Sequence, residues 1–139
     1  MNTIQVDPQA YRDFLTGVKI HEIYIKSLTA IRTRDIGSEG AITITCGPKS
    51  HEIKKNRLIV EFHTVVDGKQ SKSHESMFNL EVMYEAVYTM EREPSDSQFV
   101  QLFVNNNVIV HVWPYVRELV SNLAYRMNLP PITLSLKVN

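Results

Sequence analysis

Cysteine is almost missing from this sequence, which contains Cys46 alone among its 139 residues. An intramolecular disulfide cannot form, and the cysteine content gives no sign of an oxidising compartment. A lone thiol is a catalytic nucleophile only when the fold brings a base beside it. Since Cys46 comes at the end of an expected strand, before Gly47 and Pro48, we interpret it as an incidental, half-buried thiol.

Long apolar runs are missing as well. The longest, from Val108 to Val112, is interrupted by His111 and is far too short to span a bilayer. The first residues lack the basic start and apolar stretch of a signal peptide. We therefore expect a soluble, cytoplasmic protein with no membrane insertion.

Neither sign of charge is in excess. Lys and Arg number 15, as do Asp and Glu, so the formal net charge is zero. This balance gives no electrostatic reason to expect a nucleic-acid partner. A net charge of zero also gives little electrostatic repulsion between copies of the chain, which favours an oligomer. With 43% hydrophobic and 22% charged residues, the composition is that of a folded protein, and we expect a single domain over residues 1–139.

Groups that carry chemistry are not clustered in the sequence. His21, His51 and His74 are each followed by glutamate, but none continues to the His-Glu-x-x-His pattern of a zinc site. The five glycines are scattered among expected turns and form no phosphate-binding loop. We expect no catalytic residue, no metal and no cofactor.

What the sequence does contain is a set of strand patterns. Residues 77–90 are the clearest, because Phe78, Leu80 and Val82 begin a strict alternation with more polar positions. Further strands are expected at 18–34, with a bulge or bend after Ser27, at 41–46 and at 58–66. Gly47-Pro48 is expected to end the second of these, and Asp67-Gly68 is a hairpin signal.

Helical patterns lie at both ends of the chain. Asp7 and Pro8 are typical of the start of a short helix over 7–17. Residues 95–98 form a capping-box pattern before a second short helix. A long amphipathic helix ends near Met127, followed by Asn128 as a left-handed cap. Pro114 suits the first position of that helix, although a helix that starts near Asn107 and is kinked at Pro114 is the alternative.

Strands followed by helices indicate an α+β fold, with the helices packed on one face of an antiparallel sheet. The expected boundaries are a helix at 7–17, strands over about 18–90, helices over about 96–127 and a tail at 128–139.

The last third of the chain has more apolar side chains than one small sheet needs. This surplus predicts a subunit interface or an exposed apolar groove. Its members are Phe99, Phe103, Val110, Trp113, Tyr115, Tyr125, Leu129 and Ile132. Glu81 and Glu85 share one strand face, where solvated carboxylates are favoured over a docking site.

The segment 110–134 resembles the signature of the SecB family of export chaperones. The matching residues are Trp113-Pro114-Tyr115, Arg117-Glu118 and the segment from Pro130 to Leu134. The strand from Phe78 to Tyr88 is also similar to the last strand of that family, and the likeness extends over about residues 18–134.

The resemblance implies a four-stranded antiparallel sheet, a homotetramer built as a dimer of dimers, and ATP-independent holding of unfolded polypeptides. It implies two sets of residues. Peptide binding would involve Tyr84, Phe99, Phe103, Trp113, Tyr115, Met127, Leu129 and Ile132. The oligomer interface would involve Ile23, Ile25, Val116, Leu119, Val120 and Leu123. Glu81 and Glu85 fall where the family offers acidic residues to the SecA motor.

Two departures from the family pattern favour a dedicated client. The typical second main helix and acidic tail are missing, since the sequence stops at Asn139, and this weakens the expectation of a SecA partner. The helix at 7–17 resembles that of the SecB-like chaperones of toxin–antitoxin modules, whose client is an antitoxin. Two other interpretations stay open: a small α+β enzyme or ligand-binding domain with a pocket between sheet and long helix, and an assembly or adaptor subunit.

Overall fold

The computed structural model describes residues 6–34, 36 and 40–130. Within these residues the chain forms a short helix, four long strands and two further helices. The elements are α1 (Pro8–Thr16), β1 (Val18–Arg32), β2 (Gly40–Lys54), β3 (Arg57–Gln70), β4 (Ser76–Met90), α2 (Ser97–Asn106) and α3 (Val108–Arg126). This confirms the predicted α+β fold class.

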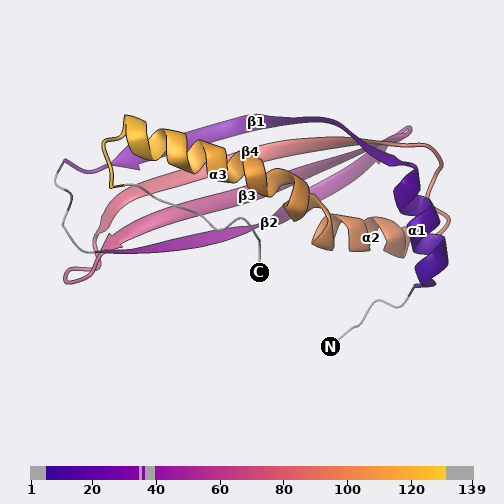
Figure 1. Ribbon diagram of the computed structural model, residues 1–139, viewed down its shortest axis with the longest axis horizontal. Coiled ribbons are helices and arrows are strands. Elements are labelled where there is room, and N and C mark those ends of the chain that lie inside the picture. The colour runs from indigo at the N-terminus through magenta and orange to yellow at the C-terminus, as the bar shows by residue number, and fades with distance from the viewer. Residues whose placement is uncertain (1–5, 35, 37–39, 131–139) are drawn as a thin grey trace.

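The four strands form one antiparallel sheet in the order β1-β4-β3-β2. The central strands are β4 and β3, while β1 and β2 are the two edges. Figure 1 shows α2 and α3 lying along one face of the sheet and α1 at the end of the sheet where β1 begins. We call the face under α2 and α3 the inner face.

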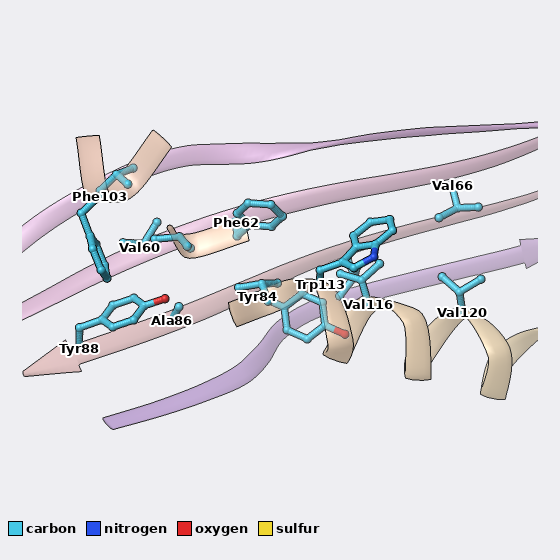
Figure 2. Packing of buried hydrophobic residues seen from close by; sticks show 14 of the residues in the cluster. Val60, Phe62, Val66, Tyr84, Ala86, Tyr88, Phe103, Trp113, Val116 and Val120 are labelled. Carbon is cyan, nitrogen blue, oxygen red and sulfur yellow. The ribbon is translucent and has the colours of Figure 1, made fainter. Parts of the chain in front are cut away.

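The core lies between the inner face and one stripe of α3. Val108, Val112, Val116 and Val120 recur every four residues and are at most 2% exposed, so they form one continuous apolar ridge. Figure 2 shows Val116 and Val120 of this ridge, with Trp113, among the side chains of β3 and β4. Fully burying one such side chain contributes roughly 1.5–3 kcal/mol.

Pro114 lies inside α3 rather than at its first position. The prediction that the helix starts at Pro114 is therefore wrong, and the alternative start near Asn107 is confirmed. The proline ring is tolerated because Pro114 is exposed and its missing N–H leaves only the carbonyl of Val110 without a helical donor. The Tyr84 hydroxyl donates to the carbonyl oxygen of Tyr115 at 3.1 Å and joins α3 to β4 beside the proline.

Two expected strand ends are also wrong. β2 continues through Gly47 and Pro48, because an edge strand tolerates a residue with no N–H donor and the register shifts between Pro48 and Ser50. β3 continues through Gly68, which faces Phe78 across the sheet. A Cβ at Gly68 would collide with the Phe78 ring, so that glycine makes room for the ring instead of forming a turn.

The helix ends largely follow the sequence signals. Asp7 caps α1 by accepting the Gln9 N–H, and Asn128 adopts the left-handed conformation with φ 53°. In α2 the cap is Asp96, whose carboxylate accepts the Gln98 N–H at 2.9 Å.

Phe62→Ala should destabilise the chain by about 3–5 kcal/mol, because Phe62 is fully buried at the centre of β3 and the truncation leaves a cavity. Phe62→Leu is the matched control and should cost less than about 1.5 kcal/mol. Urea unfolding measures both. Equal losses from the two variants would contradict the packing described here.

One part-buried polar pair lies at the border of the core. The Tyr88 hydroxyl and Nδ1 of His111 lie 2.9 Å apart, and the Phe103 ring packs edge-on against Tyr88 at 4.8 Å between centroids. Burial lowers the pKa of His111 below its ordinary value of 6.5. The folded chain therefore favours the neutral imidazole.

This pair predicts a loss of stability in acid. Unfolding restores the ordinary pKa of His111, so below about pH 6.5 the unfolded chain binds more protons than the folded one. The contribution of His111 is complete above that pH and is lost as the pH falls toward the lower pKa of the folded state. His111→Gln should weaken the dependence of the free energy of unfolding on pH, measured with urea between about pH 7.5 and 5.5. His51→Gln, at an exposed position, should leave that dependence unchanged. An unchanged slope in His111→Gln would contradict this account.

Candidate functional site

The helices leave the inner side chains of β1 partly uncovered. Ile25 pairs with Tyr84 and Leu28 pairs with Val82, so each points to the same face as a core residue. Yet Ile25 is 42% and Leu28 41% exposed. With Ile20, which pairs with Tyr88, they form an apolar row that we call the β1 strip.

A second apolar row lies along the opposite edge. Ile44 pairs with Val66, Cys46 with buried Thr64, and both are half-buried. Ile42 and Ile53 continue the row on the same face, and each is 45% exposed. We call Ile42, Ile44, Cys46 and Ile53 the β2 strip. Figure 1 shows β2 bordering the face that α2 and α3 cover.

Both strips run beside backbone that can still pair. Among the described residues, β1 pairs with β4 alone and β2 with β3 alone. The outer N–H and C=O groups of each edge can therefore bond to another extended chain. Apolar side chains next to an open strand edge are the requirements for adding a peptide strand to a sheet.

Four of the eight side chains expected to bind peptide are buried within this chain. Tyr84, Phe99, Phe103 and Trp113 are between 2% and 8% exposed. Figure 2 shows Tyr84, Trp113 and Phe103 among the packed core residues. By contrast Tyr115 is 47% exposed, while Met127 and Leu129 are half-buried. Ile132 lies outside the described residues.

The residues expected at the oligomer interface divide in the same way. Val116 and Val120 face the sheet and are buried within one chain, so they have little surface left for a partner. Ile25 is exposed, and Ile23, Leu119 and Leu123 are half-buried. The outward side of α3 also exposes large apolar side chains: Val110, Tyr115 and Tyr125.

Sequence reasoning missed several residues of the two strips. Ile20, Leu28, Ile42 and Ile53 alternate like core residues, so their pattern marks an inner face but not an edge position. The strand order decides which inner side chains the helices cover. The one sequence signal for the edge is Pro48, since a proline within a strand points to an edge or a bulge.

Glu81 and Glu85 lie on the outer face of the sheet, each beside a basic group. Nε2 of His63 is 2.7 Å from Glu81, and Nζ of Lys26 is 3.7 Å from Glu85. Lys26 also donates to Glu61, which raises the pKa of Lys26 and lowers that of Glu61. On this surface Lys26 forms ion pairs with Glu61 and Glu85, and His63 is hydrogen-bonded to Glu81, so it is not a bare acidic spot.

The described residues offer little for chemistry. No three His, Cys, Asp or Glu side chains gather there as metal ligands would. Burial raises the pKa of the Cys46 thiol and so disfavours the reactive thiolate. No helix among them is long and apolar enough to cross a membrane.

A solved structure has this architecture. The structure is similar to the Mycobacterium tuberculosis SecB-like chaperone Rv1957 in complex with a ChAD peptide from the Rv1956 HigA1 antitoxin, with a TM-score of 0.79 and 15% identity, covering 94% of this chain and 98% of that one. A Streptococcus agalactiae protein of unknown function gives a TM-score of 0.37 at 13% identity, covering 85% and 96% of the two chains.

No curated protein matches the chain by sequence. The family model described as preprotein translocase subunit SecB, however, matches residues 13–139. The match includes the whole sheet, α2 and α3, and the chain therefore belongs to the SecB family.

Proposed function

We propose that this protein is an ATP-independent chaperone that holds unfolded or nascent polypeptides along the β2 strip. Membership of the SecB family supports a chaperone role. The observation that carries the proposal is the exposed apolar row of β2 beside an unpaired strand edge among the described residues. An extended client pairs with the edge through its backbone and places alternate side chains against Ile42 and Ile53.

This mode of capture requires no chemistry. An unfolded chain exposes apolar surface, and burying that surface against the strip contributes about 25 cal/mol per Å². Backbone pairing does not depend on the client sequence, so one edge serves many sequences. A holdase of this kind prevents aggregation by occupying surface and consumes no nucleotide.

The client is either a set of exported precursors or one dedicated protein. The similar Mycobacterium protein was solved with an antitoxin peptide, which supports a dedicated antitoxin-like client here. The export role would add SecA as a partner at Glu81 and Glu85.

The β1 strip supports a second part of the proposal, assembly of a homotetramer. Pairing of β1 with its copy would join two sheets and cover Ile25 and Leu28. The outward apolar side chains of α3, including Tyr115, would then pack two such dimers together. In this proposal β1 forms a subunit interface and β2 binds clients.

Cys46 lies in the β2 strip and provides a natural reporter of client binding. Because burial raises the pKa of its thiol, alkylation should be slow at neutral pH and faster as the pH rises. A cysteine-free, chemically unfolded polypeptide should slow the reaction several-fold. Thr45→Cys with Cys46→Ser is the matched control, since position 45 is exposed on the opposite face and should stay unprotected. Equal protection of both positions, or of neither, would refute client binding on the inner face of β2.

The two edges can be separated with a pair of matched substitutions. Ile25→Lys and Ile53→Lys place the same charge at residues that are 42% and 45% exposed on β1 and β2. Ile25→Lys should lower the oligomer mass measured by light scattering, because it puts a charge into the proposed β1 interface. Ile53→Lys should leave the mass unchanged and weaken client binding. The reverse pattern would show that the assignment of the edges is wrong.

A further inference from the structure

Helix α1 contacts the rest of the chain through Phe14 and Leu15, which pack against the main core, and through an aromatic contact with α2. None of its side chains is fully buried. Tyr11 and Phe14 lie one helical turn apart and pack on Phe99 of α2, with ring centroids 5.7 and 5.6 Å from that ring. The Tyr11 hydroxyl donates to Oδ1 of Asn107 at 3.2 Å. The amphipathic face of α1 therefore binds one side of α2.

Phe99 packs against both aromatic rings of α1. It is 4% exposed, like the other three buried residues of α2. Those three, Val100, Phe103 and Val104, belong to the main core cluster, whereas Phe99 does not. The ring of Phe99 is thus a separate apolar site on α2, and α1 occupies it in this structure.

A cavity of about 420 Å³, open to solvent, lies between α1, residues 91–95 and the start of α2. Its apolar lining includes Phe14, Val18, Met90 and Phe99, and its polar lining includes Asp13 and Glu91. Helix α1 therefore borders solvent on this side, and with no fully buried side chain it is held by fewer buried contacts than α2 and α3.

The sheet does not depend on α1 either. The chain passes from α1 into β1 at Gly17, whose carbonyl oxygen accepts the Glu91 N–H at 2.8 Å. The first strand pair, Val18 with Met90, follows directly. Helix α1 can therefore leave Phe99 by a change at Gly17 while every strand pair stays in place.

We propose that the surface around Phe99 is a second polypeptide-binding site and that α1 is its built-in competitor. Its ligand class is a short amphipathic segment with two aromatic residues three positions apart, the arrangement that Tyr11 and Phe14 present. A client segment of this kind displaces α1 and extends into the cavity. The role of the site in client capture rests on the proposed holdase function, whereas competition for Phe99 does not.

Competition has a measurable consequence. The apparent affinity of a site is its intrinsic affinity multiplied by the fraction of molecules in which the site is open. Opening α1 by substitution should thus strengthen binding of a ligand that fits Phe99. It should leave the β2 strip, on the other edge of the sheet, unchanged.

The test uses Arg12, which is exposed and faces away from Phe99. Arg12→Pro in the full chain should disrupt α1, because proline removes a backbone N–H donor and its ring clashes with the preceding turn, while Arg12→Ala keeps the helix. The probe is a fluorescent peptide with the sequence of residues 7–17. It should bind Arg12→Pro at least about tenfold more tightly than Arg12→Ala or the unchanged chain. The same peptide with alanine at both aromatic positions should not bind.

Hydrogen exchange at α1 and α2 reports whether the site has opened. If Arg12→Pro leaves α1 protected or unfolds the sheet, Tyr11→Ser with Phe14→Ser opens the site instead. Equal peptide affinity for the opened and closed chains, or equal binding of the alanine peptide, overturns the proposal. Peptide binding as expected without any suppression of client aggregation would leave the Phe99 site standing and refute the holdase function.

Discussion

The structure depends on the packing of one valine ridge against two strands. A helix with its side chains is about 10–12 Å wide and neighbouring strands lie about 4.8 Å apart, so one helix covers roughly two strands of a sheet. Val112 and Val116 of α3 are fully buried over the inner face, which β3 and β4 fill with core side chains. The edge strands are covered only in part: Ile44 and Cys46 of β2 pack against the core, whereas Ile25 of β1 and Ile53 of β2 stay exposed.

That mismatch in width explains the surfaces on which the proposed function depends. Ile25 on β1 and Ile53 on β2 are apolar and point to the core face, yet each keeps more than two fifths of its surface exposed. A monomer gains nothing from such residues on unpaired edges, which invite aggregation. In the proposed function the exposed residues of β1 are buried by assembly, and those of β2 bind the client. In the further proposal, α1 covers a second binding site at Phe99 until a client segment displaces it.

The sequence predicts the fold class because alternation in β4 and the four-residue valine spacing in α3 are strong local patterns. Local rules place Pro48 and Pro114 at the ends of secondary-structure elements, but in the structure Pro48 lies inside β2 and Pro114 inside α3. The site is harder to predict. Tyr84 and Trp113 are aromatic, which makes them candidates for peptide binding in the sequence, but in the structure Tyr84 on β4 and Trp113 on α3 are both buried between the sheet and the helix. Ile42 and Leu28 look like core residues because nothing in a single sequence specifies which strand is an edge.

Holding of unfolded polypeptides is the central claim, and light scattering tests it most directly. A chemically unfolded client is diluted into buffer with increasing amounts of this protein and no nucleotide. The account predicts dose-dependent suppression of aggregation that is complete near one oligomer per client, and an antitoxin-like client should require the least protein. Undiminished aggregation of several clients, including an antitoxin, by a folded and oligomeric sample would contradict it.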